Sequence, residues 1–336
     1  MKKRREKMQK KKKLSFKKFI LFFLFQIVFL LITTPFWIFK GPFKNVKDTM
    51  VESIMATRHK YLATIFLSQS EVDSIISKSI SNAKTDSQDT TQIKVSDNGD
   101  VNISRFDIHT ARFDGYILEI NNPKSVKVGM TQKLGKVGQT TSEIAEENNA
   151  VAAINGGAFR DSSNDGKIYE GTGAFPGGIV LSDGKLLFSD AKDDELVDVT
   201  GFTKDGILVV GKYTYNQLKK MDVTEALSFG GVNSTLIVNG KPQIQDDGGQ
   251  GLNPRTAIGQ KENGTVIMLV IDGRGLVKNG ATLREIQDIM LKMGAWNAAN
   301  LDGGSSTTMY YNGSVINNPS NWDGERTVAT AFYVEK

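Results

Sequence analysis

The residues best suited to chemistry lie in one short stretch near the C-terminus, from Ala298 to Met309. A short apolar strand delivers Asn300 and Asp302 to its end, and Gly303 and Gly304 then allow a sharp turn before four hydroxyl residues. Free backbone N–H groups, small side chains and hydroxyl donors around one carboxylate suit an anionic ligand. The same letters also describe a strand that ends in an ordinary Asp-Gly turn.

Two further predicted strands end in the same way. One stops at Asn155-Gly156-Gly157, and the other stops at Asp272-Gly-Arg. If these strands are neighbours in one sheet, their ends meet at one edge and form a shared pocket.

Two arginines can supply positive charge to such a pocket. Arg255 follows a proline that stiffens the backbone, and Arg326 precedes the last predicted strand. Arginine presents a planar fork of donors that matches phosphate or carboxylate. Each residue alone reads most simply as part of a turn or a surface ion pair, but together they fit a phosphorylated or otherwise anionic sugar.

The composition excludes several kinds of catalytic site. The chain of 336 residues has no cysteine, so a disulfide framework, a thiolate nucleophile and a cysteine zinc site are impossible. Its two histidines, His59 and His109, do not neighbour a nucleophile motif. We therefore expect catalysis by carboxylates, arginines, amides and hydroxyls, without a cofactor.

The net charge of +5 comes from one end of the chain. Residues 1–18 hold eleven basic and one acidic residue, a net of +10, and the remainder has 31 basic and 36 acidic residues, a net of −5. The body of the protein therefore gives no electrostatic case for nucleic-acid binding.

An apolar stretch of 21 residues, Phe19–Phe39, follows this basic tail and matches the length of a membrane-spanning helix. A cleaved signal peptide is the competing interpretation, but a small-residue cleavage site is missing at the exit, Pro-Phe-Trp-Ile-Phe-Lys. The sequence favours a signal anchor in the cell membrane: residues 1–18 form a cytoplasmic tail, 19–39 span the membrane once, and the rest is extracytoplasmic.

Residues 40–96 read as a stalk and linker. Apolar residues recur at helical spacing, and a second helix is predicted to start at Ser70 with Asp73 three residues on, in the manner of a capping box.

Residues 97–336 form the predicted globular domain. Turn pairs at Asn239-Gly240, Asn263-Gly264 and Asn312-Gly313 predict hairpins, whereas capping boxes at Thr140 and Thr282 open two helices. The fold class is therefore α+β, a mostly antiparallel sheet domain with a few packed helices, preceded by one transmembrane helix and a helical stalk.

Five motifs in this domain resemble those of the phosphodiester glycosidase family. They read Ala-Ile-Asn-Gly-Gly-x-Phe, Asn-Pro-Arg-Thr-Ala-Ile-Gly, Asp-Gly-Arg, Asn-Leu-Asp-Gly-Gly-Ser-Ser-Thr and Glu-Arg-Thr-Val-Ala-Thr, in the order of the family, from about Ser104 to the C-terminus. Two positions depart from the pattern: Ala158 stands where an aromatic residue is usual, and Ser305 stands where a third glycine is usual.

The resemblance implies an extracytoplasmic hydrolase that cleaves a sugar 1-phosphodiester in a cell-surface glycan, such as a teichoic acid or an exopolysaccharide. The implied catalytic residues are Asp302 and Asp272 as acid/base or nucleophile pair, Arg255 on the phosphate, and Glu170 as a further carboxylate. The implied substrate-binding residues are Asn155, Gly156, Gly157, Asn300, Gly303, Gly304, Ser306 and Arg326. A non-catalytic glycan-binding module and a glycosyl or phosphoglycosyl transferase acting on a cell-wall polymer are the alternatives.

A metal site is not expected. The segment Asp161–Asp165 has the oxygen spacing of the first half of a calcium loop, but position twelve is Thr172 and no helices are predicted to flank it.

Overall fold

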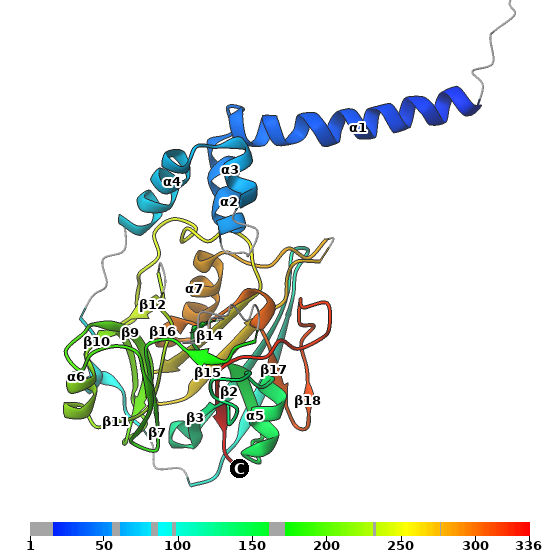
Figure 1. The fold of residues 1–336 in the computed structure, drawn as a ribbon. Coiled ribbons are helices and arrows are strands. Elements are labelled where there is room, and N and C mark those ends of the chain that lie inside the picture. Colours follow the sequence, from blue (N-terminus) through cyan, green and yellow to red (C-terminus); the bar gives the residue numbers. More distant parts are fainter. Residues whose placement is uncertain are drawn as a thin grey trace, which may run out of the picture.

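A computed structural model describes residues 16–55, 61–81, 87–95, 99–160, 172–230, 233–275 and 277–336 (Figure 1). Glu170 and the segment Asp161–Asp165 lie outside the described residues, so their predicted roles stay predictions.

The N-terminal helix α1 (Phe16–Lys40) contains the whole predicted span Phe19–Phe39. Among the described residues it is the one helix long and apolar enough to cross a membrane, and most of its apolar side chains are exposed, Phe39 being buried. The helix itself is therefore confirmed, whereas the choice between a retained anchor and a cleaved signal stays a prediction.

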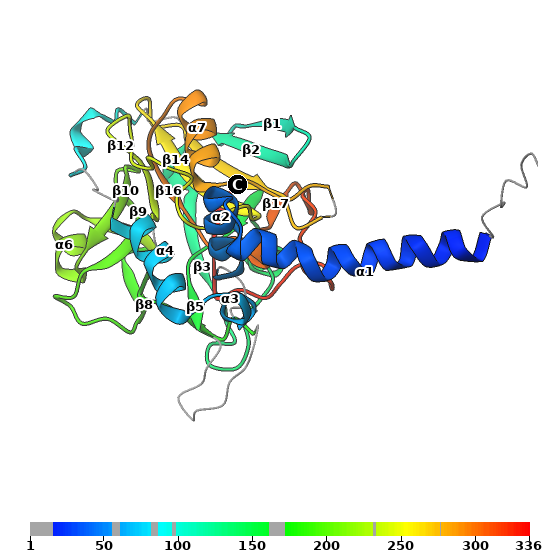
Figure 2. The same cartoon turned by 90° about the horizontal axis from the view of Figure 1, so that it is seen from above.

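Three short helices pack against the end of α1: α2 (Lys44–Met55), α3 (Tyr61–Phe66) and α4 (Gln69–Ser81) (Figure 2). They enclose a small apolar core of Phe39, Val51, Ala63, Leu67 and Val72. The predicted stalk is thus a compact helical unit with a core of its own.

The capping box of α4 lies two residues earlier than predicted. Glu71 accepts a hydrogen bond from the Ser68 backbone N–H at 2.8 Å, and the Ser68 hydroxyl accepts one from the Glu71 backbone N–H at 3.3 Å. Ser68 and Glu71 therefore satisfy the first free N–H groups of the helix, the role that the sequence had suggested for Ser70 and Asp73.

Residues 87–95 lie against the globular domain, although they fall within the predicted linker. The Gln88 side-chain amide accepts a hydrogen bond from Val210 N at 2.8 Å and donates one to Leu208 O, and Lys94 N donates to Glu262 O at 2.7 Å. Contacts of the domain therefore extend back to about residue 87.

The largest sheet has seven strands in the order β1-β2-β15-β14-β16-β12-β13. Its strands are β1 (Ile103–His109), β2 (Asp114–Ile120), β12 (Thr235–Val238), β13 (Lys241–Pro242), β14 (Arg255–Lys261), β15 (Val266–Ile271) and β16 (Ala295–Asn300).

Two five-stranded sheets complete the main framework, in the orders β10-β9-β11-β7-β8 and β18-β17-β4-β19-β3, and β5 (Phe159–Arg160) pairs with β6 (Phe175–Pro176). Their strands are β3 (Val126–Met130), β4 (Ala152–Asn155), β7 (Ile179–Ser182), β8 (Lys185–Ser189), β9 (Val197–Thr203), β10 (Leu208–Tyr213), β11 (Val223–Ser228), β17 (Met309–Tyr311), β18 (Ser314–Val315) and β19 (Thr330–Val334).

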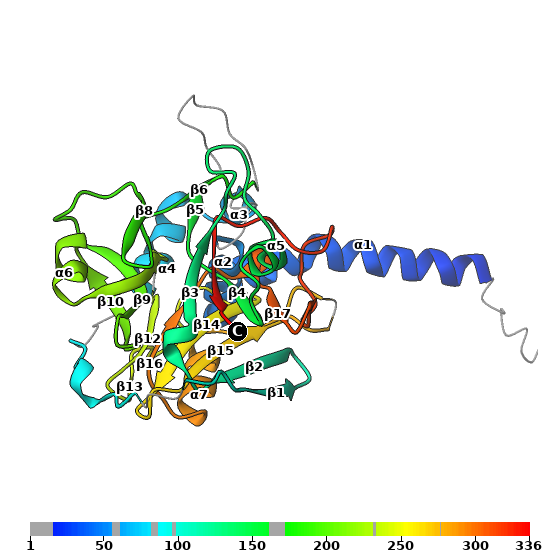
Figure 3. The ribbon, with the colours of Figure 1, turned by 90° about the horizontal axis from the view of Figure 1, so that it is seen from below.

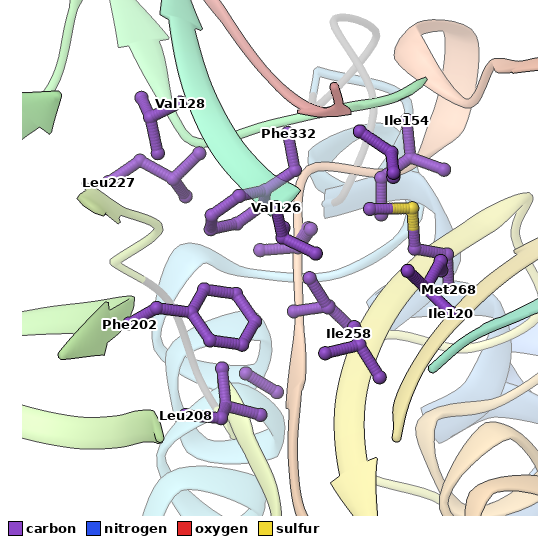
Figure 4. Packing of buried hydrophobic residues seen from close by; sticks show 14 of the residues in the cluster. Ile120, Val126, Val128, Ile154, Phe202, Leu208, Leu227, Ile258, Met268 and Phe332 are labelled. Atoms are coloured by element: carbon purple, nitrogen blue, oxygen red, sulfur yellow. The ribbon is translucent and has the colours of Figure 1, made fainter. Parts of the chain in front are cut away.

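The three sheets share one apolar core. Figure 4 shows side chains from all three meeting there, among them Met268 of β15, Phe332 of β19 and Phe202 of β9. The Phe202 and Phe332 rings meet edge to face, with their centres 6.1 Å apart. Because this core joins the sheets, it fixes the relative positions of the strand ends that carry the polar motifs.

Helices cover the outer faces of the sheets (Figure 3). Helix α7 (Leu283–Lys292) packs Leu283, Ile286 and Met290 on the seven-stranded sheet, and α5 (Thr141–Glu147) packs beside β4 and β19. Helix α6 (Tyr215–Lys220) covers the sheet that contains β9 and β11.

These observations confirm the predicted fold class, because every strand pairing among the described residues is antiparallel and the helices are few. The capping boxes at Thr140 and Thr282 are present as predicted. In the globular domain, the strands β1, β9 and β11 and the short helix α6 were not predicted from the sequence.

Candidate active site

The polar motifs meet at one edge of the seven-stranded sheet. Arg255 at the start of β14 lies opposite Ile271 at the end of β15, and Ala257 lies opposite Asn300 at the end of β16. Asp272 and Asp302 therefore leave this sheet on either side of the start of β14. The strand that carries Asn155 belongs to a different sheet, and β14 lies between β15 and β16. The expectation that the three glycine-terminated strands are neighbours in one sheet is therefore wrong: two of them share a sheet, and none is adjacent to another in it.

Asn155 connects the motifs to one another. Its side-chain N–H donates to the Asp302 backbone carbonyl at 2.6 Å, and its side-chain oxygen accepts from the Thr256 hydroxyl at 2.7 Å and from Thr308 N at 3.1 Å. The residue is fully buried. Asn155 therefore positions the backbone around Asp302, whereas we had predicted that it binds a sugar hydroxyl.

Gly156 and Gly157 are required by close packing between sheets. A Cβ on Gly156 would lie 2.7 Å from the Thr330 hydroxyl, and one on Gly157 would lie 2.3 Å from the Ser228 carbonyl oxygen. Gly156 O also accepts a hydrogen bond from Asp302 N at 3.1 Å. Because neither glycine has a side chain, the end of β4 packs closely against its neighbours, and its backbone holds Asp302 through this hydrogen bond.

Asp302 is the carboxylate of this edge with the most perturbed acidity. It is partly buried, and this burial raises its pKa to about 6, against the opposing effects of the Ser306 hydroxyl, Arg326, the Gly303 N–H and Arg274. A carboxyl group with such a pKa changes charge near neutral pH, which is the property needed for acid/base or nucleophilic work.

Arg326 lies near Asp302 and lowers its pKa. Its guanidinium carbon is 4.7 Å from the centre of the Phe159 ring, and its Nη1 donates to the Ser305 hydroxyl at 3.3 Å. Ser305, the departure from the family pattern, therefore contacts the arginine that faces Asp302. The aromatic ring and the hydroxyl together restrict the guanidinium to one position.

Arg274 also lies near Asp302 and lowers its pKa, and it was not among the residues predicted for the site. It is exposed, and its Nη2 donates to the Asn253 side-chain oxygen at 3.1 Å. Desolvation of the guanidinium lowers the pKa of Arg274, with Asp302 acting to raise it and Arg326 to lower it. A Cβ on Gly304 would lie 2.8 Å from this Nη2, so the glycine makes room for the guanidinium. The signal was present in the Asp-Gly-Arg motif, whose last residue is Arg274.

Arg255 has a different environment from the one predicted for a phosphate clamp. Its guanidinium is buried and donates to Ala281 O at 3.0 Å, to Gln250 Oε1 at 2.7 Å and to Gly251 O at 2.7 Å. Burial, with the nearby charge of Arg274, lowers its pKa to about 9. These bonds hold the 250–251 loop and the segment before α7 against the start of β14.

Asp272 is buried, and both of its oxygens are engaged. Oδ1 accepts from the Asn317 side chain at 2.8 Å, and Oδ2 accepts from Asn318 N at 2.9 Å. Asn317 in turn accepts from Met309 N at 2.7 Å and donates to Thr307 O at 3.2 Å. Asp272 therefore supports the turn that follows Asp302, while burial raises its pKa.

The remaining predicted residues line the turn itself. Gly303 admits the Pro254 carbonyl oxygen, which would lie 2.7 Å from a Cβ. The Asn300 side-chain oxygen is buried and has no hydrogen-bond partner among the described residues. Because buried polar atoms are normally paired, this oxygen is suited to a donor that a ligand or a water supplies.

The site thus places Asp302, whose pKa is raised, near Arg274 and Arg326. These three groups together carry a net positive charge when Asp302 is ionised. Within the described residues, no group of three or more acidic and histidine side chains could hold a metal ion. The chemistry available here is anion binding next to a titrating carboxyl group.

Comparison with known proteins agrees with this arrangement. The family model described as phosphodiester glycosidase matches residues 148–335. An uncharacterized protein of Bacillus subtilis, SPbeta prophage-derived YomE, is 30% identical over 228 residues, which are 63% of this chain and 31% of that protein. The N-acetylglucosamine-1-phosphodiester alpha-N-acetylglucosaminidase of Bos taurus is 27% identical over 219 residues, 59% of this chain and 39% of the relative. The chain thus spans less than half of the length of these relatives.

Solved structures share the fold. The catalytic domain of zebrafish N-acetylglucosamine-1-phosphodiester alpha-N-acetylglucosaminidase, auto-inhibited by its pro-peptide, superposes with a TM-score of 0.57 at 24% identity, covering 73% of this chain and 86% of the other. A putative exported protein of Burkholderia pseudomallei gives a TM-score of 0.50 at 15% identity over 67% and 74% of the two chains.

Proposed function

The chain belongs to the phosphodiester glycosidase family, and from this premise we propose that it hydrolyses a sugar 1-phosphodiester to a free sugar and a phosphate monoester. The curated animal relatives are named for this class of bond. The charges of Arg274 and Arg326 near Asp302 are the observation that carries the proposal, because a phosphodiester supplies the negative charge that two arginines bind and a carbon that a carboxyl group acts upon.

In this mechanism Arg274 and Arg326 hold the phosphate. Their charge stabilises the phosphate monoester as it leaves the sugar, so the reaction requires little help from a strong general acid. We assign the clamp to Arg274 in place of Arg255, because Arg274 is exposed whereas Arg255 is buried on neutral acceptors.

Asp302 acts at the sugar carbon. Above pH 6 it is ionised and serves as nucleophile or as base for the attacking water, and it stabilises the positive charge that develops on the sugar ring. Asn300 contributes its unpaired oxygen to a sugar hydroxyl. Asp272 and Asn155 keep this constellation in place, and Glu170 stays a predicted further carboxylate.

The reaction takes place on a cell-surface glycan. Helix α1 with its net +10 flank supports a single-pass anchor whose C-terminal domain lies outside the membrane. The anchored domain would reach this glycan from the membrane surface, and the glycan is a phosphodiester-linked polymer.

The test is to incubate the full chain in detergent with an N-acetylglucosamine 1-phosphodiester, with and without an acceptor glycan. Release of free sugar and phosphate monoester in water supports hydrolysis, whereas formation of a new glycoside only with the acceptor indicates a transferase. Saturable binding without either product would make the protein a glycan-binding module. The Asp302→Asn variant, which keeps the shape of the side chain, is the control for product formed by this site.

A further inference from the structure

The residue before Arg326 is Glu325, the first residue of the fifth motif, to which the mechanism assigns no role. Its carboxylate contacts Ser142 in the first turn of α5. Oε2 accepts a hydrogen bond from Ser142 N at 3.0 Å, and Oε1 accepts one from the Ser142 hydroxyl. Glu325 thus ties the segment that carries Arg326 to a helix 183 residues away in the sequence.

The surroundings of this carboxylate make it depend on Ser142. Glu325 is half-buried, and burial raises the pKa of its carboxyl group, against the lowering effect of the two hydrogen bonds from Ser142. Glu143 and Glu146 of the same helix raise this pKa as well. Ser142 therefore supplies the donors that water no longer supplies in full.

The chain on the other side of Arg326 is held by the residues that precede the same helix. Val328 N donates to Gln139 O at 2.8 Å, and Gln139 N donates to Val328 O at 3.0 Å. Gly138 leaves room for this bridge, because a Cβ there would lie 2.4 Å from Val328 O. Residues 138–142 therefore hold the short segment around Arg326 on both sides.

The side-chain contacts of Arg326 require its backbone to be well placed. The hydrogen bond from its Nη1 to the Ser305 hydroxyl is 3.3 Å long, and its guanidinium carbon lies 4.7 Å from the centre of the Phe159 ring. Because that hydrogen bond is already near its upper limit of length, a backbone shift of about 1 Å would break it.

We propose that Glu325 is a positioning residue: by bonding to Ser142 it fixes Arg326 where the guanidinium can hold the phosphate of the substrate. This inference rests on the proposed function, in which Arg326 binds that phosphate. The two hydrogen bonds of the carboxylate carry the effect, and its charge does not. Because small displacements of a binding group have large effects on its ligand, loss of the tie should weaken phosphate binding.

The test measures two quantities on the full chain in detergent: the Kd for inorganic phosphate, by titration calorimetry, and KM for an N-acetylglucosamine 1-phosphodiester. Glu325→Ala removes both hydrogen bonds and should raise each value about tenfold. Glu325→Gln should keep both values near those of the wild type. Its amide oxygen accepts from Ser142 N, and its NH2 group donates to the Ser142 hydroxyl, which can act as donor or acceptor. Ser142→Ala removes one of the two bonds and should cause a smaller rise.

Two controls separate positioning from a general loss of stability. Glu143→Ala removes another carboxylate of the first turn of α5, which accepts from Thr140 N at 2.8 Å. It should lower Tm, as Glu325→Ala does, without changing the Kd for phosphate. In the Arg326→Ala background, Glu325→Ala should cause no further rise in Kd, because Glu325 acts through Arg326.

Three results would overturn the inference. The first is a Kd for phosphate in Glu325→Ala equal to that of the wild type. The second is an equal loss in Glu325→Gln, since the charge of the carboxylate would then be the cause. The third is a double variant in which the effects of Glu325→Ala and Arg326→Ala multiply.

A failure of the proposed hydrolysis is distinguishable from a failure of this inference. If the wild type cleaves no phosphodiester but binds phosphate, the Kd values of the variants alone decide. A wild type that binds no phosphate refutes the role of Glu325, because Arg326 then has no anion to hold.

Discussion

Replacing Asp302 with asparagine distinguishes a catalytic role of this carboxylate from a structural one. The ordinary pKa of an aspartate side chain is 3.8, and burial raises that of Asp302 to about 6. One pKa unit corresponds to about 1.4 kcal/mol, so the ionised Asp302 lowers the free energy of unfolding at pH 7 by at most about 3 kcal/mol.

The sign follows from proton binding. Because the folded state binds the Asp302 proton more tightly than the unfolded state does, stability falls as the pH rises from about 4 through 6. Asp302→Asn has no proton to lose there, so it should show a smaller fall and should be the more stable protein at pH 7. For a domain of this size, the gain corresponds to a rise of several degrees in Tm.

The assay is thermal unfolding of the full chain in detergent between pH 4 and pH 8, with turnover measured on the same preparations. We expect the two proteins to differ little at pH 4, and the variant to melt higher at pH 7 with turnover reduced by orders of magnitude. A variant that melts lower at pH 7, with the same dependence on pH as the wild type, would refute the reasoning, since Asp302 would then be a stabilising, ionised residue of the turn.

The other residues give further expectations. Arg274→Lys should raise KM for a phosphodiester more than tenfold at unchanged Tm, because a point charge cannot replace the bidentate fork; an unchanged KM would remove Arg274 from the clamp. Arg255→Lys should lower Tm by several degrees through the loss of buried hydrogen bonds, with little effect on KM, and the reverse pattern would return the clamp to Arg255. Asp272→Asn should lower the free energy of unfolding by about 1–3 kcal/mol, measured by denaturation, because its amide cannot accept at both positions; equal stability with lost turnover would make Asp272 catalytic. Mass spectrometry of the mature protein should find Phe19–Phe39 retained, and an N-terminus beyond residue 33 would contradict the anchor.

Local signals in the sequence predicted much of the fold. The hairpin turns at Asn239-Gly240 and Asn312-Gly313 require positive φ at both residues, and both pairs adopt it. Helix α7 follows from its capping box and its apolar stripe, and it ends at Gly294, whose φ is +84°.

The arrangement of the sheets could not be predicted in the same way. The position of β4 in a second sheet depends on long-range pairing, and no local pattern shows that a glycine pair will pack against Thr330 of β19. For this reason the motif predicted a site role for Asn155 but placed it on the ligand, whereas its hydrogen bonds go to the backbone and side chains of other motifs.

The roles of the two arginines could not be predicted from the sequence either. Arg255 and Arg274 both stand in the motifs, and only their surroundings distinguish a buried side chain that holds carbonyl oxygens from an exposed one that faces Asp302. The proline before Arg255 indicated a rigid backbone, and the structure agrees. A rigid backbone, however, suits a buried packing residue as well as a ligand-binding one.

The docking of Gln88 has a consequence for the solubility of the domain. Strand β10 is the edge of its sheet, and an uncovered edge offers unpaired N–H and carbonyl groups to any other strand. The amide of Gln88 satisfies one of each, at Val210 and Leu208, and so replaces part of a neighbouring strand. A protein shortened to begin at residue 97 would lose this cover, and its β10 edge would be open to pairing with a second molecule.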